Sequence, residues 1–140
     1  MDASSTDSTD RLNVLFVCSR NQWRSPTAEH VWRRDARVNA RSAGTSASAR
    51  RVVSAADIAW ADVILVMEHK HKSRLMAEHR QSLAHKRLHV LDIPDDYRYL
   101  DPELVELVGA PVAALLGLAP DGRTASKGAR TAAVRRRDVS

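Results

Sequence analysis

Short apolar runs recur along the middle of the chain, and longer polar segments separate them. Residues 12–17, 63–67 and 88–93 are apolar runs of the length of a buried strand, and residues 38–43 form a weaker run. This pattern predicts four strands.

The segments between these runs carry signals that are typical of helices. Residues 25–37 have apolar positions at helical spacing, and Pro26 suits a first helical turn. Ser54 has a capping-box partner three residues later, which predicts a short helix over residues 54–60. A polar helix is expected over residues 69–85.

The last helix is predicted to begin with Asp101 as its cap and Pro102 in its first turn, and Pro111 should break or kink it. Strands that alternate with helices indicate an α/β protein with a small parallel sheet. In such sheets, ligands bind beyond the carboxyl ends of the strands. We expect Cys18 and the segment after the fourth strand to lie there.

The composition is that of one soluble globular domain: 140 residues, 44% hydrophobic and 28% charged. We predict that this domain covers residues 11–119, and that residues 1–10 and 120–140 are disordered tails. The net charge of +5 suits an anionic substrate without identifying one. No aromatic residues interleave with the arginines at 135–137, so a nucleic-acid partner is not expected.

The single cysteine permits no intramolecular disulfide and no zinc site of the Cys-x-x-Cys kind. The acidic, polar N-terminus lacks the pattern of a signal peptide, and no apolar run approaches the roughly 20 residues of a membrane span. These features predict a reducing, cytoplasmic location and no membrane partner. They leave the oligomeric state open.

The cysteine, Cys18, ends the first apolar run and lies six residues before Arg24. A loop of five residues that leads into a helix can turn its backbone N–H groups inward and bind a tetrahedral oxyanion, and Arg24 would bind two more oxygens. The same positive field favours a thiolate, and the Ser25 hydroxyl is placed to donate to it. This combination predicts phosphoryl transfer through a covalent thiophosphate; a buried inert cysteine is the alternative.

The stretch VLFVCSRNQWRSPTAEH, residues 14–30, resembles the signature V-C-x-x-N-x-C-R-S-P-x-A-E of the low-molecular-weight protein tyrosine phosphatases. The resemblance implies that Cys18 is the nucleophile, that Arg24 binds phosphate and that Ser25 assists the thiolate. It also implies that Asn21 has a left-handed conformation. The phosphate-binding loop would consist of Cys18, Ser19, Arg20, Asn21, Gln22, Trp23 and Arg24.

A second segment, RSAGT at residues 41–45, is similar to the second-strand motif of that family, so Ser42 would steady the Asn21 loop. The resemblance implies a flavodoxin-like fold, with a parallel sheet of strand order 2-1-3-4 flanked by helices. Two departures stand out. Trp23 replaces the cysteine that usually precedes the arginine, and the segment after Ser42 that usually flanks the substrate is shortened.

The mechanism needs a carboxylic acid to protonate the leaving group, and the family supplies it after the fourth strand. The segment LDIPDDYRYLDPELVEL offers four aspartates. Asp92 lies inside the strand pattern, and Asp101 is explained as a helix cap. Asp95 is the first choice for the acid, and Asp96 is the second.

Three aromatic residues near these positions each have two interpretations. Tyr97 and Tyr99 either line the pocket or pack against the last helix, and Trp23 either forms a pocket wall or fills the core behind the loop. The histidines of EHKHK, residues 68–72, are interpreted as part of a solvated basic helix, with His69 and His71 on different faces. No metal or cofactor is expected, because arginine and amides already neutralise the phosphate.

The sequence therefore predicts a cysteine-dependent phosphomonoester hydrolase whose substrate is a phosphotyrosine protein or another aryl phosphomonoester. One alternative is an arsenate reductase of the same fold that uses an external thiol, since the chain has no further cysteine for an internal relay. The other alternative is a non-catalytic module that binds phosphorylated ligands.

Overall fold

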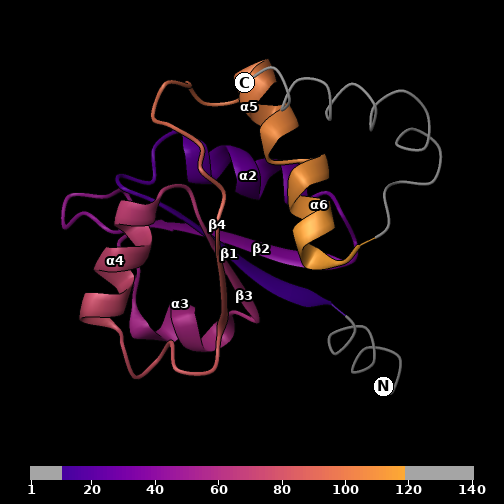
Figure 1. Cartoon of the computed structure of the whole chain (residues 1–140). Helices are drawn as coiled ribbons and strands as arrows, with labels where there is room; N and C mark the ends of the chain where they lie inside the picture. The colour runs from indigo at the N-terminus through magenta and orange to yellow at the C-terminus, as the bar shows by residue number, and fades with distance from the viewer. Residues whose placement is uncertain (1–10, 119–140) are drawn as a thin grey trace.

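Four parallel strands form one sheet in the computed structural model, which describes residues 11–118 (Figure 1). The strands are β1 (Leu12–Cys18), β2 (Val38–Gly44), β3 (Val63–Val66) and β4 (Arg87–Val90), and their order is β2-β1-β3-β4. The predicted α/β class and strand order are confirmed. The two predicted tails lie outside the described residues.

Strand β1 lies inside the sheet and pairs with β2 on one side and with β3 on the other. Its last residue, Cys18, is opposite Gly44 of β2, and Val17 is opposite Val66 of β3. Because all the strands are parallel, the segments that follow them leave from the same edge of the sheet. This register brings Cys18 to that edge.

Within residues 11–118, five helices cover the two faces of the sheet: α2 (Arg24–Trp32), α3 (Ala55–Trp60), α4 (His69–Glu78), α5 (Pro102–Leu107) and α6 (Ala110–Leu116). Successive β1 side chains point to opposite faces. Val14 and Phe16 belong to the apolar cluster beneath α2, α5 and α6, whereas Leu15 and Val17 belong to the cluster beneath α3 and α4 (Figure 1). No helix within residues 11–118 is long and apolar enough to cross a bilayer.

Two helices are shorter than predicted. Helix α2 ends at Trp32 instead of residue 37, because the Asp35 carboxylate accepts a hydrogen bond from the Arg37 amide and turns the chain into β2. Helix α4 ends at Glu78 instead of residue 85, and turns lead from there to β4. The capping box of Ser54, the cap of Asp101 and the break at Pro111 are confirmed.

The fourth strand is also shorter than the predicted run of residues 88–93. The amides of Leu91 and Ile93 still bond to carbonyl oxygens of Val66 and Met67, each at 2.8 Å. Asp92 between them has a φ of +58°, a left-handed conformation that a regular strand cannot contain. Asp92 therefore lies beyond β4 and outside the strand where the sequence placed it.

Gly44 ends β2 directly beside the loop that follows Cys18. A Cβ atom on Gly44 would lie 2.5 Å from the carbonyl oxygen of Ser19 and 2.6 Å from the Cβ of Ala49. The Ser19 oxygen is backbone and cannot rotate away, so only a residue without a side chain fits at this position.

We predict that Gly44→Ala lowers the free energy of unfolding by at least about 2 kcal/mol, because the added methyl group must displace backbone. Urea titration of both proteins measures the difference. Gly109→Ala is the matched control, since its Cβ would meet ordinary contacts of 3.4 and 3.6 Å. Equal stability of Gly44→Ala and the parent protein would contradict this account of the close approach.

Candidate active site

The loop between β1 and α2 has its first carbonyl groups tied to the neighbouring segment. The carbonyl oxygens of Cys18, Ser19 and Arg20 accept hydrogen bonds from the amides of Thr45 (2.9 Å), Ser46 (2.9 Å) and Arg50 (3.0 Å). Within residues 11–118, the amides of residues 19–23 donate to no other protein atom. Outward carbonyls and unpaired amides at the start of a helix make a site for an anion.

Asn21 holds the middle of this loop. Its φ is +56°, a conformation that asparagine tolerates better than most residues. Its side-chain nitrogen donates to the hydroxyl oxygens of Ser25 at 3.0 Å and Ser42 at 2.9 Å, and Ser42 in turn donates to a carboxylate oxygen of Glu29 at 2.5 Å. All these polar groups lie behind the loop, where they fix its shape.

The sulfur of Cys18 lies 3.0 Å from the hydroxyl oxygen of Ser25, and the cysteine is buried. Because the Ser25 oxygen accepts a hydrogen from Asn21, its own hydrogen is free to point elsewhere. The sulfur is nearer to it than the Ala43 carbonyl oxygen, which is 3.4 Å away. The hydroxyl is therefore placed to donate to the sulfur.

Arg24 is 3% exposed, although it carries a charge. Its Nη1 donates to a carboxylate oxygen of Glu68 at 3.0 Å and to the carbonyl oxygen of Ile93 at 2.8 Å. Burial alone would raise the pKa of Glu68, but the hydrogen bond and charge of Arg24 hold that pKa below its usual value. The guanidinium is therefore oriented by two segments that follow β3 and β4.

Of the four aspartates that follow β4 within residues 11–118, Asp95 is the one that ion-pairs with Arg24. Its carboxylate oxygen lies 3.7 Å from Nε of Arg24, and its side chain is 60% exposed. Asp92 faces His69 at 3.8 Å, and Asp101 caps α5. The charge of Asp96 acts on Tyr97.

Trp23, Tyr97 and Tyr99 lie at the same end of the molecule as the loop. Trp23 is 40% exposed, with the Arg98 guanidinium 5.9 Å from its ring centre, so it does not fill the core. Gln22, Trp23 and Tyr99 line a surface pocket of about 290 Å³.

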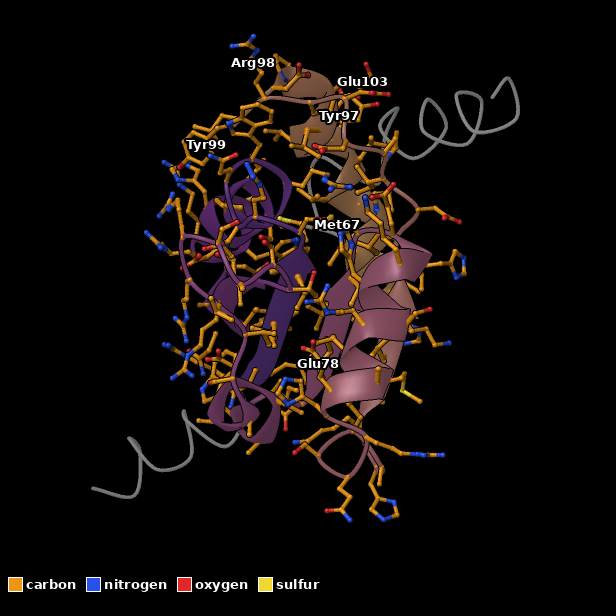
Figure 2. The ribbon with its side chains drawn as sticks, turned by 90° about the vertical axis from the view of Figure 1, so that its left-hand side faces the viewer. Met67, Glu78, Tyr97, Arg98, Tyr99 and Glu103 are labelled. Carbon is orange, nitrogen blue, oxygen red and sulfur yellow. The ribbon has the colours of Figure 1, made fainter. Side chains whose placement is uncertain are left out.

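Tyr97 packs against the last helices, and its hydroxyl donates to Glu103 of α5 at 3.2 Å (Figure 2). Its burial and the Glu103 carboxylate raise the pKa of Tyr97. Tyr97 thus has a packing role, whereas Tyr99 lies at the pocket.

The interpretation of the histidine segment as a solvated helix is wrong for His71. His69 is exposed, as a solvated residue should be, but His71 is 1% exposed. Nδ1 of His71 accepts a hydrogen bond from the Glu68 amide at 3.0 Å, and Nε2 lies 2.9 Å from the hydroxyl oxygen of Ser19. The helix turns this residue inward, toward the loop.

Two side chains of the site were missed by sequence reasoning, Glu68 and His71. The signal for Glu68 was its place directly after an apolar strand, at the ligand-binding edge of a parallel sheet. The signal for His71 was its position three residues after the residue that caps α4, where a side chain can bond back to the cap.

Burial and the nearby Arg24 cation lower the pKa of His71 to about 4 from an ordinary 6.5. The unfolded chain therefore binds a proton on this residue between about pH 6.5 and pH 4 that the folded chain does not bind. As the pH falls through this window, the free energy of unfolding should decrease, by on the order of 3 kcal/mol at most.

Urea titrations at about pH 7 and about pH 5 measure this decrease, and His71→Gln should remove most of it. The titration of Glu68 does not contribute to this difference. Because its pKa is lowered in the folded chain, it changes the free energy of unfolding only at pH values below its ordinary pKa of 4.5. An equal pH dependence in both proteins would show that His71 titrates normally.

Several solved structures share the architecture of this chain. An arginine phosphatase, YwlE of Geobacillus stearothermophilus, has a TM-score of 0.59 at 20% identity, with 76% of this chain and 93% of that chain covered. A low-molecular-weight phosphotyrosine phosphatase of Vibrio cholerae O395 has a TM-score of 0.59 at 22% identity, covering 76% and 95%. The fold is that of the low-molecular-weight phosphotyrosine phosphatases.

The tyrosine phosphatase Wzb of Escherichia coli K30, solved with phosphate, shares this low-molecular-weight phosphatase fold with a TM-score of 0.56 at 21% identity, covering 69% of this chain and 89% of that one. No protein-family model and no curated protein sequence matches the chain. Likeness at these identities establishes the fold and leaves the chemistry to the residues of the site.

Proposed function

We propose that the protein is a cysteine-dependent phosphatase that hydrolyses phosphomonoesters, with phosphotyrosine as the substrate class. The observation that carries the proposal is the loop from Cys18 to Arg24. Its first three carbonyl groups are bound outward, its amides at residues 19–23 are unpaired within the described residues, and its cysteine sulfur lies beside a hydroxyl donor. Such a loop binds a phosphate group and holds a nucleophile next to it.

In the first step, the thiolate of Cys18 attacks phosphorus opposite the leaving oxygen. A sulfur–phosphorus bond forms while the phosphorus–oxygen ester bond breaks, and the leaving oxygen takes a proton from Asp95. The loop amides and the Arg24 guanidinium stabilise the charge on the three equatorial oxygens. No metal ion is needed in this scheme.

In the second step, the Asp95 carboxylate takes a proton from a water molecule, which attacks phosphorus. Inorganic phosphate forms and the sulfur leaves as a thiolate. Because the Ser25 hydroxyl lies 3.0 Å from that sulfur, it stabilises the departing negative charge.

The assignment of the general acid to Asp95 is supported by its contact with Arg24 and its exposure. The carboxylate lies 3.7 Å from the guanidinium and is open to solvent, so it can reach a bound ester. Asp96 remains the second choice.

The choice of phosphotyrosine is supported by the aromatic side chains beside the loop, Trp23 and Tyr99, which can flank a phenyl ring. Phosphoarginine is the second candidate substrate, because one solved neighbour of the same fold is an arginine phosphatase. A free, reduced thiol is required for either substrate, in keeping with the predicted cytoplasmic location.

Assays on matched phosphotyrosine, phosphoserine and phosphoarginine peptides distinguish these substrates, and arsenate reduction with small thiols tests the reductase alternative. Higher kcat/KM on phosphotyrosine peptides is expected. Binding of phosphopeptides without turnover would favour the non-catalytic alternative.

We predict that Cys18→Ser lowers aryl phosphate hydrolysis by at least about 10³-fold, since a serine hydroxyl is un-ionised at neutral pH and is a poor nucleophile here. Calorimetric binding of inorganic phosphate should persist, because the loop amides and Arg24 remain. Normal turnover by this variant would rule out a phosphocysteine intermediate.

We further predict that Asp95→Asn lowers kcat by about 10²-fold or more on phenyl phosphate, because an amide cannot protonate the leaving oxygen. The loss should be smaller on an aryl phosphate whose phenol leaves easily without a proton. Asp96→Asn is the matched control and should stay within about 3-fold of the parent. The reverse ranking of the two variants would assign the acid to Asp96.

A further inference from the structure

The N-terminus of α4 reaches the phosphate loop at two points. Glu68, the residue that caps the helix, binds Arg24 at the end of the loop, with a distance of 3.0 Å between Oε1 and Nη1. His71, one turn into the helix, contacts Ser19 at the start of the loop, with 2.9 Å between Nε2 and the hydroxyl oxygen. The proposed phosphatase reaction has no step that uses His71.

The hydrogen bonds of His71 decide which of its ring nitrogens carries the proton. Nδ1 lies 3.0 Å from the backbone N–H of Glu68, which can only donate, so Nδ1 must be the acceptor. In a neutral ring the proton is then on Nε2, which donates to the Ser19 hydroxyl oxygen. The ring thus connects the backbone of the α4 cap to a side chain of the loop.

The surroundings keep this ring neutral. It is 1% exposed, and a cation there would lose its hydration. The charged groups that act on it are Arg24 and Lys70, which oppose a second positive charge, and Glu68 and Asp95, which favour one. Protonation of Nδ1 would also break its hydrogen bond with the Glu68 amide, so charging the ring would detach it from the helix cap.

Both the side chain and the carbonyl group of Ser19 form hydrogen bonds. Its side-chain oxygen accepts from His71, and its carbonyl oxygen accepts from the amide of Ser46 at 2.9 Å. The carbonyl bond holds the peptide group after Ser19, and the side-chain bond anchors Ser19 between the two peptide groups that follow Cys18. The direction of the first loop amides toward the phosphate depends on the orientation of these peptide groups.

We propose that His71, as a neutral ring protonated on Nε2, is a positioning residue that orients the first amides of the phosphate loop through Ser19. The proposal rests on the proposed phosphatase function for its kinetic consequence, but the loop geometry also predicts phosphate binding without turnover. Loss of the bond should weaken the binding of phosphate and lower kcat, because both depend on the same amides.

The test is a double-mutant cycle that combines His71→Asn with Ser19→Ala. Asparagine keeps an acceptor near the position of Nδ1, so the helix cap is preserved, but it is too short to reach Ser19. We expect His71→Asn to lower kcat/KM on an aryl phosphate about 10-fold or more and to weaken inorganic phosphate binding similarly. The double variant should be no worse than Ser19→Ala alone.

Two further variants serve as controls. His71→Gln places a donor near the position of Nε2 and should recover much of the activity that His71→Asn loses. His69→Asn changes the exposed histidine of the same helix and should leave kcat/KM and phosphate binding unchanged.

Calorimetry with inorganic phosphate on the Cys18→Ser background separates failure of this proposal from failure of the phosphatase assignment. A parent protein that hydrolyses no phosphoester would overturn the proposed function, while the phosphate affinities would still test the loop. If His71→Asn weakened phosphate binding equally in the Ser19 background and in the Ser19→Ala background, the positioning role would be overturned and only a structural role would be left. If His71→Asn does not fold, unchanged phosphate affinity in Ser19→Ala overturns the proposal on its own.

Discussion

The orientation of the peptide groups that follow Cys18 is the constraint on which the site depends. A peptide group that turns its carbonyl oxygen to one side turns its N–H to the other. The segment of residues 45–50 binds three successive carbonyl oxygens of the loop, so the N–H groups face the opposite side. An anion on that side would meet several aligned dipoles and the N-terminus of α2.

That orientation is maintained by contacts from several parts of the chain. Gly44 allows β2 to approach the Ser19 carbonyl closely, and Asn21 takes the left-handed conformation that the loop requires. Ser42 and Glu29 complete a buried chain of hydrogen bonds behind Asn21. Each of these groups has a partner, and within the described residues no buried side-chain nitrogen or oxygen lacks one. A satisfied buried network of this kind favours a single loop conformation.

The charge at the site is positioned in the same way. Arg24 is buried, and Glu68 and the Ile93 carbonyl oxygen bind one of its nitrogens. Those two partners follow β3 and β4, and Asp95 comes two residues after Ile93. Cys18, Arg24 and Asp95, the proposed nucleophile, cation and acid, therefore converge because three parallel strands end at one edge of the sheet. Trp23 and Tyr99 are both exposed and line one surface pocket.

The local part of this arrangement could be predicted from the amino-acid sequence. The predicted features were local: apolar runs of strand length, the caps at Ser54 and Asp101, and the helix break at Pro111. The spacing of Cys18, Arg24 and Ser25 is local as well. Neighbours within a few residues along the chain determine all these features. The ends of α2 and β4 came earlier than predicted, because of the Asp35 turn and the left-handed φ of Asp92. Three contacts at the site join residues 44 to 71 positions apart: the ion pair of Asp95 with Arg24, and the hydrogen bonds of His71 with Ser19 and of Glu68 with Arg24. Such contacts exist only once the sheet has brought the ends of its strands together, and for that reason only the tertiary structure decided them.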